Sequence, residues 1–214
     1  MKPWLKRIRF VLGGLLLAQA LVRVYLYLRP KITPPSLKFL LDSRIREWYR
    51  DPPTTLAPLG LRPGQIVLEV GGGTGFFTIA AAQQIGPNGL LLSIELQRGM
   101  LSALQRRVRF ANLRTISVEQ ADAMALPFAD ESIDAALMIA VLPMVPRKQQ
   151  VLRELRRVLK PGARLLISEE VIAPEYVPPL ITRRWARRAE FEIVTQDPGF
   201  WSYSVLCRKP YVAG

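Results

Sequence analysis

The sequence predicts a doubly wound α/β fold with a mostly parallel seven-stranded sheet, a C-terminal antiparallel hairpin and an added N-terminal hydrophobic helix. Three observations predict it. From residue 64 onward, β-rich runs alternate with helical patterns, and a glycine-rich loop directly follows the first run. The last two β-rich runs have only a short turn between them, so they should pair antiparallel. Strands that alternate with helices form right-handed βαβ units and a parallel sheet.

Each element rests on a short pattern in the chain. The strands are runs of apolar and β-branched residues bounded by glycine, proline or polar residues, and the helices are longer stretches with periodic apolar positions. Strands are expected at residues 66–70, 90–94, 114–118, 133–139, 164–168, 191–195 and 201–207. Helices are expected at residues 76–86, 97–108 and 148–159, and a turn at residues 196–199.

The N-terminal segment is the least ordinary part of the chain. Residues 10–28 are nineteen in number and contain one charge, Arg23, with basic residues on both sides. About twenty apolar residues span a bilayer, so residues 1–30 are expected to form a basic, hydrophobic membrane anchor. A helix lying in the interface, a buried core helix and a signal peptide with cleavage near Ala20 are the alternatives. Basic residues on both sides leave the orientation of a spanning helix open.

Residues 31–62 are expected to link this anchor to the domain, which takes up residues 63–214. Prolines punctuate the link, and residues 36–49 show an amphipathic helical pattern that includes Trp48. This helix is expected to act as a lid or strut between membrane and active site, or simply to pack on the domain.

The basic charge of the chain is concentrated in its N-terminal part. Residues 1–62 hold twelve Lys or Arg and three Asp or Glu, whereas residues 63–214 hold eighteen and fourteen. An arm of this charge favours an anionic membrane surface or nucleic acid. The alternative is ordinary solubilising charge.

The residue types present exclude several kinds of chemistry. The chain has no His and one Cys, Cys207, so it lacks imidazole bases, Ser-His-Asp triads, disulfides within the chain and thiolate clusters. No metal site is therefore expected. Any proton transfer must use a carboxylate, Tyr, Lys, Cys or water.

A glycine loop after the first strand indicates that the backbone passes close to a ligand. The spacing is Glu69-x-Gly71-x-Gly73-x-Gly75. A dinucleotide site needs G-x-G-x-x-G, and Phe76 or Thr78 would occupy the place of its last glycine, which argues against an NAD(P)-dependent reductase. Glu95 ends the second strand, where a carboxylate can accept hydrogen bonds from both hydroxyls of a ribose.

At this point the sequence resembles the class I S-adenosyl-L-methionine (SAM)-dependent methyltransferases, in particular the branch that includes quinone-biosynthesis enzymes. The resemblance runs from about residue 62 to 210. Five segments carry it in order: VLEVGGGTG, IELQRGML, ADAMALPFADESID, IAVLPMVP and LKPGARLLISE. Together they imply that SAM is the cofactor and that the chain is an enzyme.

The resemblance also implies roles for single residues. Gly71, Gly73 and Gly75 would let the backbone wrap the methionine part of SAM, and Glu69 would organise that loop. The residues implied for the nucleoside are Glu95 on the ribose, Met100 near the adenine face, Asp122 as acceptor from the adenine amino group, and Ala123 with its amide toward a ring nitrogen.

The methyl acceptor is expected to be lipophilic. Enzymes that methylate the amino groups of DNA bases resemble one another in an amide or carboxylate at the place of Ala140-Val141-Leu142-Pro143, and this segment has neither. Methylation of arsenic resembles a chemistry that needs several cysteines, and this chain has one. We therefore expect methyl transfer to a quinone precursor or lipid at a membrane, with the domain facing the cytoplasm, no nucleic acid partner and an unidentified catalytic base. The alternative is a non-catalytic, methyltransferase-like subunit of a membrane protein assembly.

Overall fold

The structure is a computed structural model, and it describes residues 50–171, 173 and 175–211, together with four helical residues near the N-terminus: Gly13, Gly14, Leu17 and Leu21. The rest of the predicted anchor at residues 1–30, and the predicted helix at residues 36–49, lie outside the described residues. Among the helices that are described, none combines the length and apolar character that a membrane crossing needs.

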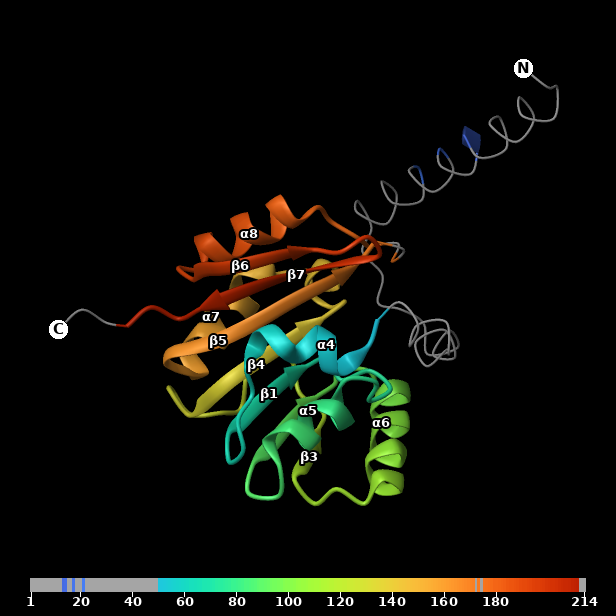
Figure 1. Cartoon of the computed structure of the whole chain (residues 1–214), viewed down its shortest axis with the longest axis vertical. Coiled ribbons are helices and arrows are strands. Elements are labelled where there is room, and N and C mark those ends of the chain that lie inside the picture. Colours follow the sequence, from blue (N-terminus) through green and yellow to red (C-terminus); the bar gives the residue numbers. More distant parts are fainter. Residues whose placement is uncertain are drawn as a thin grey trace.

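A seven-stranded sheet in the order β3-β2-β1-β4-β5-β7-β6 forms the centre of the domain (Figure 1). The first five strands in this order are parallel, and β7 pairs antiparallel with both β5 and β6. The strands are β1 (Ile66–Val70), β2 (Leu90–Ile94), β3 (Ile116–Glu119), β4 (Ile133–Ile139), β5 (Leu159–Glu170), β6 (Glu192–Pro198) and β7 (Ser202–Arg208).

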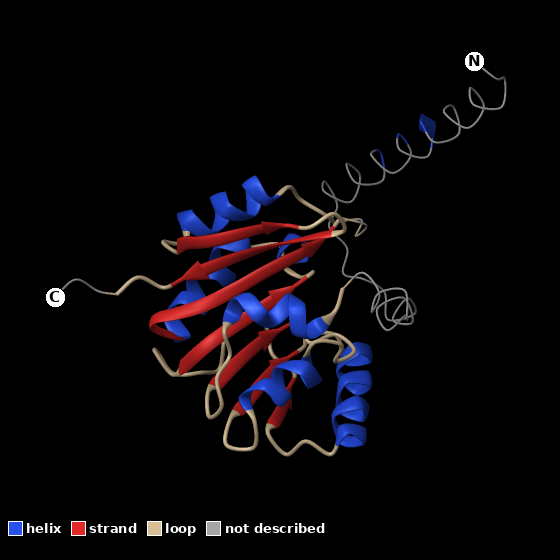
Figure 2. Ribbon diagram, viewed as in Figure 1, coloured by secondary structure: helices blue, strands red, loops and turns tan. Residues whose placement is uncertain are grey.

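Helices cover both faces of this sheet (Figure 2). On one face α4 and α5 pack against the central strands, and on the other face α7 and α8 do so. The helices are α4 (Pro52–Leu56), α5 (Thr78–Ile85), α6 (Arg98–Ala111), α7 (Lys148–Val158) and α8 (Pro179–Arg188), with short 3-10 turns η2 (Ala57–Leu59) and η3 (Leu142–Met144).

The core has two halves because side chains alternate across each strand. In β1, Leu68 packs in the half that contains α7 and α8, whereas Val67 packs in the half that contains α5. Central strands buried on both faces need apolar residues at nearly every position, which is why their sequence reads as a continuous apolar run.

The predicted seven-stranded, mostly parallel α/β sheet with its C-terminal antiparallel hairpin is confirmed, whereas the predicted N-terminal hydrophobic helix is not shown in the described part of the chain. The strands β1, β2 and β4 begin and end where the sequence places them. The other boundaries shift by a few residues. The largest difference is β5, predicted at residues 164–168, which extends to Leu159–Glu170 because Leu159 pairs with Ile133 and Glu170 pairs with Ser202. The first helix starts at Thr78 rather than residue 76.

The C-terminal hairpin also differs in detail. The predicted turn at residues 196–199 is mostly strand, since β6 continues to Pro198, which lies opposite Tyr203. Proline is tolerated there because β6 is an edge strand whose outer side needs no ladder partner.

Arg50, the first residue of the continuous described chain, is fixed to the carboxyl-terminal edge of the parallel strands. Its guanidinium donates to Oγ of Ser168 at 2.7 Å, and its Nε lies 3.8 Å from a carboxylate oxygen of Glu170. The side chain is 1% exposed and its charge lies over the ring of Phe77. The chain therefore enters the domain over the edge that carries the candidate site described next.

Candidate functional site

The glycine loop after β1 needs glycine at alternate positions. Gly71, Gly73 and Gly75 have φ angles of 75°, 58° and 89°, a region that disfavours other residues. The backbone N–H groups of Gly71 and Gly72 both donate to the carbonyl of Ile94, at 2.8 and 3.2 Å, which ties the loop to the end of β2. The predicted spacing thus corresponds to a defined backbone shape.

Close packing adds a second constraint on this loop. A Cβ at Gly71 would lie 2.4 Å from Cγ2 of Val141, and one at Gly72 would lie 2.3 Å from Oγ of Ser93. Gly72 is required for this packing, although the alternating spacing did not single it out.

Glu69 lies just before the glycine loop and forms hydrogen bonds to the elements around it. Its Oε2 accepts hydrogen bonds from the hydroxyls of Thr78, at 2.6 Å, and Ser93, at 2.5 Å. Burial raises the pKa of Glu69; those two hydrogen bonds oppose the rise, and the charge of Glu95 adds to it. The side chain therefore joins β1, β2 and the start of α5.

Glu95 lies at the carboxyl end of β2, as predicted, and it is buried. Its Oε2 accepts from the backbone N–H of Gly73 at 3.0 Å, and its Oε1 accepts from the N–H of Gln97 at 2.8 Å. The two backbone donors fix the carboxylate between the glycine loop and the start of α6.

Asp122 and Ala123 lie together in the turn after β3. Oδ1 of Asp122 accepts from the backbone N–H of Met124 at 2.9 Å, so this oxygen shapes the turn. Both residues line a cavity of about 130 Å³, together with Glu95 and Leu96.

A second cavity of about 90 Å³ adjoins the first and contains Glu69, the glycine loop and Met100. The two cavities share Gly71, Glu95, Gln97, Val141 and Met144 as walls. The arrangement is an elongated site in which Glu95 stands between the glycine loop and Asp122. A nucleoside with a charged tail fits this order, with the base near Asp122, the sugar at Glu95 and the tail at the loop.

The structure brings seven of the eight predicted site residues to these two cavities, whereas Gly75 lines neither of them. Met100 lines the cavity of the glycine loop and not that of Asp122. Sequence reasoning missed Gln97, Val141 and Met144, which line both cavities. Their position just after β2 and β4 was the available signal, because ligands of open α/β sheets bind at the carboxyl ends of the strands.

Ala140 adds strain at the same edge. It follows β4, lines the second cavity and has a φ of 55°, which is unusual for a residue with a side chain. Its N–H donates to the carbonyl of Ser168 at 2.8 Å. Such strained residues gather at functional sites.

Metal and thiol chemistry find no support in the described part of the chain. No group of three or more His, Cys, Asp or Glu side chains gathers there in a way that could hold a metal ion. Cys207 lies buried in β7, and burial raises the pKa of its thiol to about 12.

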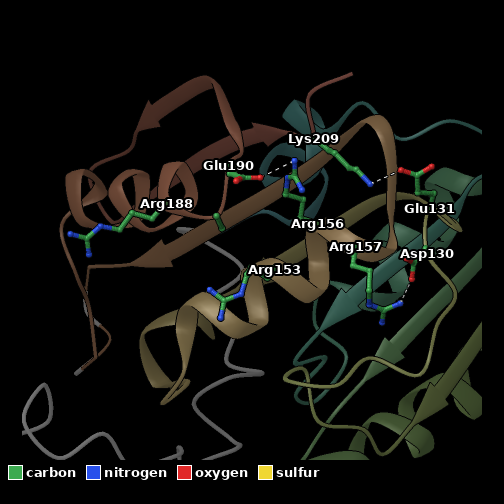
Figure 3. Close-up of a pocket in the computed structure, with 9 residues that line it drawn as sticks. Asp130, Glu131, Arg153, Arg156, Arg157, Arg188, Glu190 and Lys209 are labelled. Carbon is green, nitrogen blue, oxygen red and sulfur yellow. Dashed lines mark hydrogen bonds and ion pairs between the residues drawn. The ribbon is translucent and has the colours of Figure 1, made fainter. Parts of the chain in front are cut away.

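A larger cavity of about 610 Å³ lies at the opposite edge of the sheet, where Asp130 and Glu131 precede β4, and Figure 3 shows the side chains that line it. Its acidic and basic side chains pair across it: Asp130 with Arg157 at 2.7 Å, Glu131 with Lys209 at 2.9 Å and Glu190 with Arg156 at 3.0 Å. It has neither a glycine loop nor the carboxyl end of a parallel strand. We therefore place the functional site at the two smaller cavities.

At this opposite edge, Arg157 and Glu154 form hydrogen bonds to a loop that leads from the candidate site. Arg157 donates to both oxygens of Glu154 and to the carbonyls of Leu126 and Phe128, and Glu154 accepts from the N–H of Leu126. These contacts fix the loop that continues directly from Asp122.

Comparison with known proteins agrees with this geometry. A family model described as a methyltransferase domain matches residues 68–167. The chain is 38% identical over 112 residues to a demethylmenaquinone methyltransferase of Lactobacillus johnsonii, covering 52% of this chain and 46% of the relative. It is 33% identical over 111 residues to an arsenite methyltransferase of Halobacterium salinarum, covering 52% and 28%.

Among solved structures, a SAM-dependent methyltransferase from Aquifex aeolicus superposes with a TM-score of 0.78 at 24% identity. The match covers 83% of this chain and 99% of that one, and it shows a common fold. The chain spans less than half the length of the two curated relatives described above.

Proposed function

We propose that this chain, which carries a class I SAM-dependent methyltransferase domain at residues 68–167, transfers a methyl group from SAM to a quinone precursor at a membrane surface. The family, the enzymatic nature of the domain and SAM as its cofactor, all predicted from the sequence, are confirmed by the family model and the relatives, and the structural neighbour has the same fold. The proposal concerns the identity of the methyl acceptor and the place of the reaction at a membrane.

The observation that carries the proposal is the pair of adjoining cavities that meet at Glu95. The glycine loop would hold the amino-acid part of SAM, Glu95 its ribose, and Asp122 with Ala123 its adenine. Bound there, SAM supplies a methyl group on a sulfonium as the electrophile. The protein has to align an acceptor with that methyl group and exclude water, which requires no fixed nucleophilic residue.

The wall that the two cavities share is apolar at Val141 and Met144, and an apolar acceptor would fit next to it. Val141, Met144, Val145 and Pro146 line the first cavity, and no His or acidic side chain belongs to this stretch. The methyltransferase of Lactobacillus johnsonii is named for demethylmenaquinone, an acceptor of this chemical kind. The thiol of Cys207 is buried in the sheet, which argues against thiol-dependent arsenic methylation of the kind that the other relative's name suggests.

Two features of the carboxyl-terminal edge support work at a membrane. Arg50 is bound to this edge, and the basic residues of the N-terminal part precede it directly in the sequence. The large apolar side chains of Leu180 and Phe200 are 69% and 83% exposed, at the start of α8 and at the tip of the β6–β7 hairpin. Both positions belong to the edge where β5 ends. A membrane bound there would face the site, and a cytoplasmic location would give the site access to SAM.

Methyl transfer from labelled SAM tests this function. The full chain is incubated with reduced demethylmenaquinone in lipid vesicles, with arsenite, and with no acceptor. The proposal expects label in the lipid extract with the quinone precursor only. Transfer of the label to arsenite would show that arsenite, and not a quinone precursor, is the acceptor. Binding of SAM without transfer to either acceptor would favour a non-catalytic subunit.

A further inference from the structure

A carboxyl group that no step above uses is buried at the carboxyl end of β5, although it lines neither cofactor cavity. Glu169 is the next-to-last residue of β5, at the same edge of the sheet as the cofactor cavities, and it is 2% exposed. Its Oε1 is buried and has no hydrogen-bond partner. Leaving a buried polar atom unpaired costs about 1–3 kcal/mol, so a purely structural role explains this oxygen poorly.

The position of Glu169 relates it to the cofactor through the η3 turn. The backbone N–H of Leu142 lies close enough to the carboxylate to lower its pKa. Val141, which directly precedes this turn, and Met144, which is its last residue, line both cofactor cavities. The carboxylate and the cofactor cavities therefore share one short piece of backbone, which also carries the apolar wall assigned above to the acceptor.

The charges around Glu169 make it a strong base for a carboxylate. Burial raises its pKa well above the usual range, and the nearby carboxylates of Glu170 and Glu175 raise it further. The guanidinium of Arg50 and the N–H of Leu142 act in the opposite direction. On β7, the hydroxyl of Tyr203 donates to the carbonyl of Val177, and the ring of Tyr176 packs edge-on against Tyr203 at 5.8 Å between centroids.

We propose that Glu169 is the catalytic residue that accepts the proton released by the methyl acceptor. This inference rests on the proposed function. An electron pair of the acceptor forms the new bond to the methyl carbon, and the methyl–sulfur bond breaks with its electron pair remaining on sulfur. The acceptor, which would otherwise carry a positive charge, loses the proton of its hydroxyl or ring C–H group to Oε1 of Glu169. The proton passes to water when the product leaves.

The test compares Glu169→Gln, Glu169→Asp and the neighbouring Glu170→Gln in the full chain. Glutamine keeps the size of Glu169 but cannot accept the proton. Glu169→Gln should bind SAM with a Kd within about two-fold of the wild type, and its turnover should fall by about 10²- to 10⁴-fold. Glu169→Asp should recover part of the rate. Glu170→Gln should lose far less turnover than Glu169→Gln.

The pH dependence of turnover separates catalysis from structural support. Glu169 has to be ionised to accept a proton, so the wild-type rate should fall as the pH drops through its raised pKa, above the ordinary value of 4.5. This acid limb should be absent in Glu169→Gln, present in Glu170→Gln and shifted in Glu169→Asp. If Glu169→Gln does not fold, the test rests on Glu169→Asp, in which the acid limb of the pH profile should be shifted relative to the wild type.

Turnover of Glu169→Gln within about five-fold of the wild type, or an unshifted limb in Glu169→Asp, would overturn the inference and leave the proposed function intact. A wild type that binds SAM but methylates no quinone precursor would overturn the proposed function, and this inference with it.

Discussion

Gly73 donates its backbone N–H to Oε2 of Glu95 at 3.0 Å, so the glycine loop and the carboxylate at the end of β2 are held in one arrangement. Each carboxylate oxygen can accept more than one hydrogen bond, and Glu95 can keep its backbone donors while it also binds the two hydroxyls of a ribose. The two backbone hydrogen bonds therefore fix the position of the Glu95 carboxylate without using all of its capacity to accept.

Glu95→Ala should weaken SAM binding by about 1.5–3 kcal/mol, the scale of hydrogen bonds to a charged group. This corresponds to a roughly 10- to 150-fold higher Kd in isothermal titration. Glu119→Ala is the matched control, because Glu119 ends the neighbouring strand β3 but lines neither cofactor cavity. Equal Kd values for Glu95→Ala and the wild type would show that the ribose is held elsewhere.

Gly72→Ala should destabilise the fold by about 1–3 kcal/mol, the usual cost of overpacking. The new Cβ would lie 2.3 Å from Oγ of Ser93, a group already engaged by Glu69. A thermal melt should show Tm lowered by about 2–4 °C for each kcal/mol. Adding Ser93→Ala removes the clashing oxygen, so the double variant should recover part of the loss. No recovery would mean that the strain arises from another contact.

Arg157→Met should lower stability by about 1–3 kcal/mol and also weaken SAM binding. Methionine keeps the length of the side chain but removes the hydrogen bonds to Glu154 and to the loop after Asp122. Arg153→Met is the control, since Arg153 lies one turn earlier on α7 and is exposed (Figure 3). Substitution there should stay within about 0.5 kcal/mol in denaturant titrations. Equal losses from both variants would contradict the role given to Arg157.

The cost of Arg157→Met should depend on pH. Hydrogen bonds from Arg157 hold the pKa of Glu154 below its ordinary value of 4.5. A carboxyl group with a lowered folded-state pKa stabilises the fold above its unfolded pKa, and this stabilisation is lost as the pH falls through the folded value. The stability difference between wild type and variant should therefore be largest near neutral pH and shrink below about pH 4.5. A difference that stays constant down to pH 3 would assign the effect to packing.

Phe200→Glu should reduce binding of the full chain to anionic lipid vesicles in a sedimentation assay. Phe200 is exposed at the edge that carries the site, whereas Phe110, which is 92% exposed, ends α6 at the far edge. Phe110→Glu introduces the same charge there and should leave binding unchanged. Equal losses would indicate a general effect of charge.

Salt distinguishes the modes of membrane attachment. At about 1 M salt the Debye length is roughly 3 Å, and attraction between the basic arm and anionic lipid is largely screened. A chain anchored by apolar insertion should stay with the vesicles in this wash. Complete release would leave only an electrostatic arm.

The central sheet could be predicted closely because its strands are buried on both faces. β1, β2 and β4 need apolar residues at almost every position, and glycine or polar residues mark their ends. The glycine loop was predictable for a related reason, since left-handed φ angles at Gly71, Gly73 and Gly75 leave few other residues possible.

Other features depend on contacts between distant parts of the chain, which no local pattern contains. β5 reaches Glu170 because β7 pairs along it, and β6 passes through Pro198 because it is an edge strand. The hydrogen bonds from Arg157 to residues 126–130, and the unpaired oxygen of Glu169, arise only when separate elements meet. A sequence pattern shows a strand end, but not which side chains of the next element close over it.

Binding of SAM and of NAD to the same purified chain tests the central claim most directly. Isothermal titration should show one SAM site per chain and no heat from NAD, because Phe76 and Thr78 occupy the positions where a dinucleotide loop needs its last glycine. NAD binding in the absence of SAM binding would contradict the account of this site.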